Sequence, residues 1–433
     1  MNIVMFTNTY LPQLGGVARS VDRFTRELRT AGHHVLVIAP QYDEQVEDDP
    51  DVYRIHAIQH FNGSDFSLVL PASFELSDRV EEFQPDLIHS HHPFLLGNTA
   101  LRMAAMKELP LVFTHHTMYE HYTHYVPLEL TAMKRYVARL STGYANLCDC
   151  VIAPSQSTEE IIRARGVKSP IEVVPTGLDT DRFSSGDGRQ AREELHIPEK
   201  AFVLGHVSRL APEKNEMFLI RSVVRAMKKH PFVWLLVIGS GPSREKLQEV
   251  LSEQGLAARS RLPGPLRGQE LVGAYHGMDA FVFASKTETQ GMVLTEAMAA
   301  GVPVVALDAP GAREVVEDGS NGRLVMYEDE ERFASALTDL IEMAPAAREE
   351  MIRHARHTAA AFDRKETTER LMNVYRRVLE DHPRDKTVEA DEWEATARAV
   401  KREWDIWSNR LASLGKAIGE KQLKKGQQKP RRI

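Results

Sequence analysis

Short apolar runs alternate with amphipathic segments along the first half of the chain. The opening run, IVMF, is separated by the turn-rich loop TNTYLPQLGGV from ARSVDRFTRELRTAG, in which apolar residues recur at helical spacing. The apolar run HVLVIAP follows the glycine that ends this segment, and similar runs occur in DLIHSHH, PLVFTHH and CVIAPS. Strands that alternate with helices in this order predict a parallel, doubly wound sheet.

The second half of the chain repeats this plan. FVLGHVSRL predicts a strand, NEMFLIRSVVRAMKKH an amphipathic helix, and VWLLVIGSG a strand ending in glycines, while DAFVFAS and VPVVAL continue the series. The turn-rich segment EVVPTGLDTDRFSSGDGRQ is typical of a linker between the halves. We therefore expect an α/β protein with Rossmann-like domains at residues 1–175 and 176–360. Because ligands of open α/β sheets bind beyond the carboxyl ends of the strands, the domains should face each other across a cleft.

The C-terminal residues depart from this plan. Residues 361–383 predict a helix that could cross back to the N-terminal domain, and residues 384–433 predict an appended basic tail. From residue 400 on, ten Lys and Arg accompany three acidic residues, which gives +7 within a chain whose net charge is −7. The overall negative charge argues against bulk binding of nucleic acid.

Cysteine usage and hydropathy bear on where the protein works. The only cysteines, Cys148 and Cys150, are two residues apart, a poor disulfide candidate that is typical of a reducing compartment. No apolar run approaches the ~18 residues needed to cross a bilayer. We expect a cytoplasmic protein, either soluble or held at a membrane surface.

Two glutamates flank a predicted helix start in KTETQGMVLTEAMAAGVPVV. Gly291 would let the backbone approach a ligand, and the free N–H groups of the helix that follows attract anions. Glu288 precedes the helix, where a carboxylate could also serve only to complement the helix dipole. Glu296 lies about a turn and a half inside the helix, too deep to cap it. Two acceptors beside an anion site suit a nucleotide-sugar, which has phosphates in its middle and hydroxyls at both ends.

Two cations follow a predicted strand end in SRLAPEKN. Arg209 could grip a phosphate with two hydrogen bonds, and Lys214 would add a mobile point charge. Alone, such a pair is more typical of exposed, solvated side chains. Beside the glutamate pair, it indicates a diphosphate site.

These segments, together with IGSGPSREKL, APGAREVVEDGSNGRLV, PTGLDTDRF and the N-terminal GGV, resemble glycosyltransferase family 4, retaining enzymes of the GT-B fold. Glu288 and Glu296 meet the family signature Glu-x7-Glu. The resemblance implies that the first contacts the transferred sugar and the second contacts the ribose. It also implies that Arg209 and Lys214 bind the diphosphate.

The resemblance assigns further residues to the nucleotide-sugar site. At the start of the helix these are Gly291, Met292 and Val293. From the opposite domain, the glycine pair after the first strand would lie against the phosphates, which places Gly15 and Gly16 there. Since the cations already offset the diphosphate charge, the resemblance implies no cofactor and no required metal.

A histidine and a narrower resemblance complete the prediction. THHT matches the active-site histidine of the family, and alignment on the Thr that follows favours His116 over His115. Many relatives have Phe before the glycine of the pair motif, where this chain has Gln290. TETQG, HSHHPFLLG and THHTMYEHYTHYVP together resemble the branch that glucosylates diacylglycerol at a membrane surface. We therefore expect UDP-glucose as the donor and 1,2-diacylglycerol as the lipid acceptor.

An anionic membrane surface is the expected partner of such an enzyme, at the inner face of the cell membrane. The segment LTAMKRYVARLSTGYA carries Lys134, Arg135 and Arg139 among apolar residues, a pattern typical of a lipid-binding helix face and equally of a solvated one. The basic tail with Trp404 and Trp407 suits an anionic bilayer, while a disordered extension or RNA contact are its alternatives.

Other interpretations stay open. Clustered histidines could hold zinc, but no carboxylate or cysteine recurs at ligand spacing, so a role lining the cleft is favoured. The transferase could act on a soluble acceptor, such as an inositol phosphate or an oligosaccharide. A sugar-nucleotide epimerase or a non-catalytic sensor would share the two-domain build. The clustered histidines are His89, His91, His92, His115, His116, His121 and His124.

Overall fold

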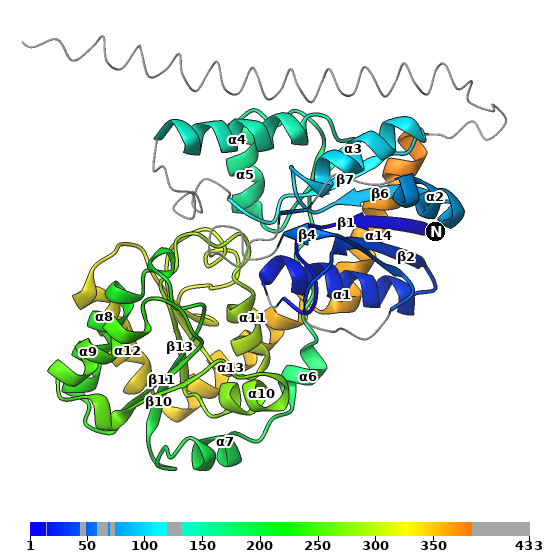
Figure 1. Cartoon of the computed structure of the whole chain (residues 1–433). Coiled ribbons are helices and arrows are strands. Elements are labelled where there is room, and N and C mark those ends of the chain that lie inside the picture. Colours follow the sequence, from blue (N-terminus) through cyan, green and yellow to red (C-terminus); the bar gives the residue numbers. More distant parts are fainter. Residues whose placement is uncertain (14, 44–48, 59–67, 70–73, 119–130, 383–433) are drawn as a thin grey trace, which may run out of the picture. The chain divides into compact units, whose positions relative to one another are not determined.

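The computed structural model describes residues 1–13, 15–43, 49–58, 68–69, 74–118 and 131–382 (Figure 1). The chain divides into two compact units. Unit 1 is Met1–Pro175 together with the residues from Thr367 on, and unit 2 is Thr176–Glu366. Within the described residues, no helix has both the length and the apolar character needed to cross a membrane. The predicted basic tail at residues 384–433 lies outside the described part of the chain.

Unit 1 is built on a parallel sheet with the strand order β3-β2-β1-β6-β7-β8-β9. The chain starts in the middle of this sheet, winds outward to one edge and then returns to wind toward the other, which is the doubly wound topology expected from the sequence. A short antiparallel pair, β4 and β5, lies outside it. The strands are β1 (Asn2–Phe6), β2 (His34–Pro40), β3 (Val52–Ile55), β4 (Ala57–Ile58), β5 (Leu68–Val69), β6 (Leu87–Ser90), β7 (Leu111–Thr114), β8 (Cys150–Ala153) and β9 (Ile171–Val173).

Helices cover both faces of this sheet because side chains of a strand alternate between its faces. Ile3 and Met5 of β1 pack in one core with residues of α1 and α14, while Val4 and Phe6 pack in the other with residues of α2, α3 and α5. Helix α14 thus returns from the end of unit 2 to complete the core of unit 1. The helices are α1 (Gly16–Thr30), α2 (Phe74–Phe83), α3 (Leu96–Met106), α4 (Thr131–Ala145), α5 (Gln156–Ala164) and α14 (Arg364–Asp381).

Unit 2 repeats the arrangement on a parallel sheet with the order β12-β11-β10-β13-β14-β15. Its two cores again lie on opposite faces: Val203 of β10 packs with residues of α6, α10, α11 and α13, and Leu204 with residues of α8, α9 and α12. The strands are β10 (Phe202–Val207), β11 (Val233–Ile238), β12 (Ser260–Gly264), β13 (Ala280–Phe283), β14 (Val304–Leu307) and β15 (Gly322–Val325). The helices are α6 (Thr180–Ser184), α7 (Gly188–Glu194), α8 (Glu216–Lys229), α9 (Arg244–Glu253), α10 (Gly268–His276), α11 (Met292–Ala299), α12 (Glu330–Ile341) and α13 (Pro345–Ala360).

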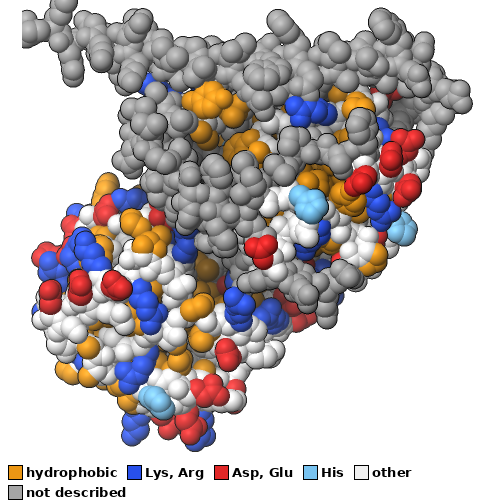
Figure 2. All heavy atoms as spheres, viewed as in Figure 1, with side chains coloured by type: hydrophobic (Ala, Val, Ile, Leu, Met, Phe, Trp, Pro, Cys, Tyr) orange, Lys and Arg blue, Asp and Glu red, His pale blue; other side chains and the backbone are white. Residues whose placement is uncertain are grey.

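The surface of unit 2 mixes charges of both signs. In Figure 2, its Lys and Arg side chains are interspersed with acidic ones rather than gathered into one basic patch. On α8, Arg221 and Arg225 both pair with Glu330 of α12. Arg225 also lies 3.8 Å from Glu331, so both cations of α8 have acidic partners on α12.

Candidate functional site

The predicted cations of unit 2 lie in the loop after β10. Residues 208–215 leave the carboxyl end of that strand and pass through a short 3-10 helix, Pro212–Lys214, before α8 begins. Arg209 forms an ion pair with Glu213, whose side chain is buried. The Nζ atom of Lys214 lies 2.5 Å from Oε1 of Glu288, in the loop after β13. The structure thus brings together two of the residues predicted from separate motifs, at neighbouring strand ends.

The predicted helix start is also present, and we call Gly291 and the first N–H groups of α11 the helix mouth. Helix α11 begins at Met292, and Gly291 is its N-cap residue with φ of 70°, in the left-handed region. A Cβ atom at Gly291 would lie 3.0 Å from the carbonyl oxygen of Gly311, so glycine suits both the backbone angle and the space. The first N–H groups of α11, those of Met292 and Val293, stand at the helix end where an anion is stabilised.

Glu296 lies inside α11 and is buried, with 2% of its surface exposed. Its Oε2 atom accepts a hydrogen bond of 3.0 Å from the hydroxyl of Tyr275 in α10. This contact orients the carboxylate from a neighbouring helix. The sequence did not reveal Tyr275, because nothing local in α10 marks it as a partner of α11.

Gln290, the residue before Gly291, makes a paired contact with the backbone of Thr176. The N–H of Thr176 donates to Oε1 of Gln290 at 2.7 Å, and Nε2 of Gln290 donates to the carbonyl oxygen of Thr176 at 2.9 Å. The side chain is buried, so both backbone groups depend on this amide. A phenylalanine could make neither bond. The contact joins the helix mouth to the first residue of unit 2.

The loop that carries the cations packs against the glycine-containing turn at residues 239–243. The N–H of Leu210 donates to the carbonyl oxygen of Ser240 at 2.9 Å, and the N–H of Ser243 donates to that of Leu210 at 3.0 Å. Gly239 has φ of 136°, and a Cβ there would lie 1.8 Å from the carbonyl oxygen of Ser208. The GSGPSR segment therefore forms a strand-to-helix turn, between β11 and α9, and supports the loop that carries Arg209.

In unit 1, His116 follows the carboxyl end of β7 and is hydrogen-bonded to His91, which follows β6. Their Nε2 and Nδ1 atoms are 2.9 Å apart. Burial lowers the pKa of both imidazoles well below its ordinary value, and neighbouring histidines lower it further, so both rings are neutral. The other nitrogen of His91, Nε2, is buried and has no hydrogen-bond partner among the described residues.

The unbonded Nε2 atom of His91 indicates where the protons of the His91–His116 pair lie. A buried lone pair without a partner is tolerated better than a buried N–H without one. We therefore assign the proton of His91 to Nδ1, from which it donates to Nε2 of His116. Neutral His116 then carries its own proton on Nδ1.

The other buried histidines of unit 1 have partners of their own. His89 bonds the Tyr375 hydroxyl at 2.6 Å and the Thr114 hydroxyl at 2.7 Å, and Nδ1 of His92 accepts the N–H of Asn8 at 3.1 Å. Within the part of the chain that the structure describes, no three His, Cys, Asp or Glu side chains converge as metal ligands would. His121 and His124 lie outside the described residues.

The predicted glycine pair of unit 1 stands at the start of α1. Gly16 is the first helical residue and Gly15 is the N-cap, with φ of −89°. A Cβ atom added at either would meet nothing within 4 Å among the described residues. Both are exposed, so a ligand has room to approach this backbone.

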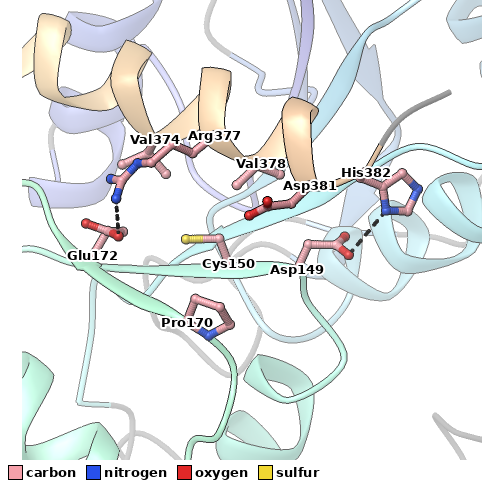
Figure 3. A pocket seen from close by; sticks show the side chains of 9 residues that line it. All are labelled: Asp149, Cys150, Pro170, Glu172, Val374, Arg377, Val378, Asp381 and His382. Carbon is pink, nitrogen blue, oxygen red and sulfur yellow. Dashed lines mark ion pairs between the residues drawn. The ribbon is translucent and has the colours of Figure 1, made fainter.

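A separate cavity of about 240 Å³ lies in unit 1 between α14 and the starts of β8 and β9 (Figure 3). Arg377 and Glu172 form an ion pair of 2.8 Å on its wall, and His382 and Asp149 one of 3.5 Å. Strands begin here, whereas ligands of such sheets bind where strands end. This cavity is therefore no part of the predicted site.

Family models match both halves of the chain: "Glycosyltransferase Family 4" covers residues 14–182, and "Glycosyl transferases group 1" covers residues 187–358. An alpha-monoglucosyldiacylglycerol synthase of Acholeplasma laidlawii is 30% identical over 336 residues, which are 74% of this chain and 84% of that protein. The chain belongs to glycosyltransferase family 4. The resemblance that its motifs predicted is thereby confirmed.

Other members of the family 4 group differ in their donors. A GDP-mannose-dependent alpha-mannosyltransferase of Mycobacterium tuberculosis is 29% identical over 350 residues, 79% of this chain and 88% of that protein. Among solved structures, HepE of Anabaena in complex with UDP superposes with a TM-score of 0.69 and 22% identity, covering 87% of this chain and all of that one. This likeness confirms the predicted GT-B fold, with its two Rossmann-like parallel-sheet domains. The protein is a glycosyltransferase.

Proposed function

We propose that this family 4 enzyme is a retaining transferase that moves glucose from UDP-glucose to 1,2-diacylglycerol at an anionic membrane surface. The observation that carries the donor part is the 2.5 Å contact between Lys214 and Glu288. It places a cation and a carboxylate together at neighbouring strand ends, beside the N-terminus of α11. A diphosphate and a sugar hydroxyl are the groups that such a pair would bind.

In the proposed reaction, the donor replaces the contact between these two side chains. Lys214 and Arg209 bind the diphosphate, together with the N–H groups of Gly291, Met292 and Val293, and stabilise the charge that develops on it. Glu288 accepts hydrogen bonds from the sugar. Glu296, oriented by Tyr275, accepts hydrogen bonds from the ribose.

The residues of unit 1 are proposed to act on the same donor. Gly15 and Gly16 offer an open backbone to the phosphates, and His116 hydrogen-bonds near the reactive end of the sugar. The acceptor hydroxyl attacks the anomeric carbon on the face of the leaving group. The bond from that carbon to the diphosphate oxygen breaks, and a phosphate oxygen takes the hydroxyl proton, so configuration is retained. No cofactor or metal enters this proposal, because the cations supply the charge.

Transfer of radiolabelled glucose to vesicles tests the assignment. We expect product only with vesicles that contain diacylglycerol, and loss of at least 100-fold in kcat/KM in Arg209→Ala and Lys214→Ala, since each removes a charge from the leaving group. Arg221→Ala is the control, because Arg221 is an exposed cation of α8 paired with Glu330. Values within twofold of the unmodified enzyme in both site variants would refute the donor site, and transfer only to soluble acceptors would refute the lipid acceptor.

The likeness to a GDP-mannose-dependent transferase supports a second candidate, a mannosyltransferase. A soluble acceptor, such as an inositol phosphate or an oligosaccharide, is a separate alternative to the lipid acceptor. Competition between UDP-glucose and GDP-mannose in the same assay decides between the donors.

A further inference from the structure

Glu216 is a buried carboxyl group to which the proposed mechanism gives no role. It is the first residue of α8, and 2% of its surface is exposed. Its Oε1 atom accepts the N–H of Ala211 at 2.7 Å. Its Oε2 atom is buried, and the hydroxyl of Ser243 is the side-chain group that can donate to this carboxyl group. A buried carboxylate is costly, so its position calls for a reason.

The bond to Ala211 anchors the loop that carries the proposed diphosphate ligands. Ala211 lies between Arg209 and Lys214 in the sequence, and its carbonyl oxygen accepts the N–H of Lys214 at 2.8 Å. Its neighbour Leu210 is bonded on both sides to the 239–243 turn. Glu216 therefore holds, from the start of α8, the middle of a loop whose two ends present the cations.

The charge of Glu216 varies near neutral pH. Burial raises the pKa of Glu216 to about 7, against an ordinary value of 4.5. Hydrogen bonds from Ser243 and from the N–H of Ala211 lower it, the negative charge of Glu213 raises it, and the positive charge of Lys214 lowers it. On the α9 side its neighbour is the uncharged Ser243. In either protonation state Oε1 can still accept the N–H of Ala211, because a neutral carboxyl group keeps an acceptor oxygen.

We propose that Glu216 is a positioning residue for the donor, which holds the Arg209–Lys214 loop and takes up a proton when the diphosphate binds. The inference rests on the proposed function, which places the diphosphate on that loop. An ionised Glu216 opposes the arrival of two further negative charges, whereas the protonated form does not. Donor binding and protonation of Glu216 therefore favour each other.

Two measurements on the full-length protein reveal the coupling. If the bound donor strengthens proton binding at Glu216 about tenfold, the KM for UDP-glucose is about fivefold higher at pH 8 than at pH 6. Calorimetry of UDP-glucose binding at pH 7.5, in two buffers with different ionisation enthalpies, then shows uptake of about half a proton. UDP-glucose suits this test because its diphosphate is a diester, with no proton to gain in this range.

Three variants separate this coupling from a general loss of structure. Glu216→Gln keeps an acceptor for Ala211 and has no charge, so we expect a low KM that changes less than twofold from pH 6 to pH 8 and no proton uptake. Glu216→Ala loses the acceptor, and its KM should rise at every pH. Glu245→Gln, the control, removes an exposed carboxylate from the first turn of α9 and should keep the pH dependence.

The outcomes also distinguish the two proposals. Proton uptake and a pH-dependent KM that persist unchanged in a folded Glu216→Gln variant, as judged by its thermal melting, would overturn the role of Glu216 alone. Failure of the unmodified protein to bind UDP-glucose at any pH from 6 to 8 would overturn the proposed donor, and this inference with it.

Discussion

Acidification should unfold unit 1 before unit 2, because the described part of unit 1 buries five neutral histidines. Burial lowers the pKa of His89 and His92 to about 3 and that of His115 to about 4, from an ordinary value of 6.5. The pKa values of His91 and His116 move in the same direction. Between these values and 6.5, the unfolded chain binds protons that the folded unit does not. Stability is therefore fully present above pH 6.5 and is lost as the pH falls toward the folded pKa values.

The size of the effect follows from this linkage. At pH 5, each of His89, His92 and His115 costs about 2 kcal/mol of unfolding free energy, or about 6 kcal/mol together. Domains have about 5–15 kcal/mol in total, so this loss is decisive. In unit 2, His206 has its pKa lowered to about 4 and loses a similar amount, but Glu216 offsets it. A carboxyl group whose pKa is raised stabilises the folded state as the pH falls.

Hydrogen exchange followed by mass spectrometry resolves the two units. After correction for intrinsic exchange, peptides from β1, β6 and β7 should lose protection between pH 7 and pH 5, while those from β10 and β13 keep it. His89→Gln should lessen the fall in stability by about 1.2 kcal/mol per pH unit near pH 5.5. His34→Gln, at an exposed position, should leave that fall unchanged. Equal protection of both units at pH 5 would refute the reasoning.

Four substitutions test other contacts. Gln290→Phe should cost about 2–5 kcal/mol of unfolding free energy by denaturant titration, since both backbone groups of Thr176 lose their partner; a cost below 1 kcal/mol contradicts this. Tyr275→Phe should raise the donor KM several-fold because Glu296 loses an orienting bond, and an unchanged KM counts against it. His91→Phe should lower kcat about tenfold with little change in donor KM, whereas His91→Asn, which can donate from the same place, should restore part of it. Gly291→Ala should cost about 1–2 kcal/mol, since alanine is strained at φ of 70°, and an unchanged thermal midpoint argues otherwise.

The fold could be predicted because its signals are local. Apolar runs such as IVMF and DAFVFAS became β1 and β13, and the amphipathic segment after the first loop became α1. The two-unit division follows from the repeat of this pattern. Parallel strands bring their carboxyl ends to one edge, so loops after β10 and β13 were expected to meet. The contact of Lys214 with Glu288 shows that these two loops do meet.

Contacts between distant positions could not be predicted in this way. The Gln290 amide meets a backbone segment 114 residues away, and no period or motif in the sequence specifies such a pairing. The histidines were expected as a group at strand ends, but the bond between His91 and His116 depends on ring rotations that a one-dimensional pattern does not carry. In the sequence, Glu216 is an ordinary polar residue near the start of a predicted amphipathic helix. Its burial follows from the packing of two loops that meet only in the folded unit.

The helix mouth of α11 joins these local and distant contributions. Gly291 provides the backbone turn, which a sequence motif can predict. The residue before it, Gln290, is held in place by its own side-chain amide, which is bonded to Thr176. A phenylalanine at this position would need a different packing of the 176–178 segment, because it leaves one donor and one acceptor of the backbone unbonded. Gln290 thus anchors that segment through its side-chain amide. The resemblance only associates Gln290 with the branch that glucosylates diacylglycerol. The contact with Thr176 gives a physical reason for a glutamine at this position.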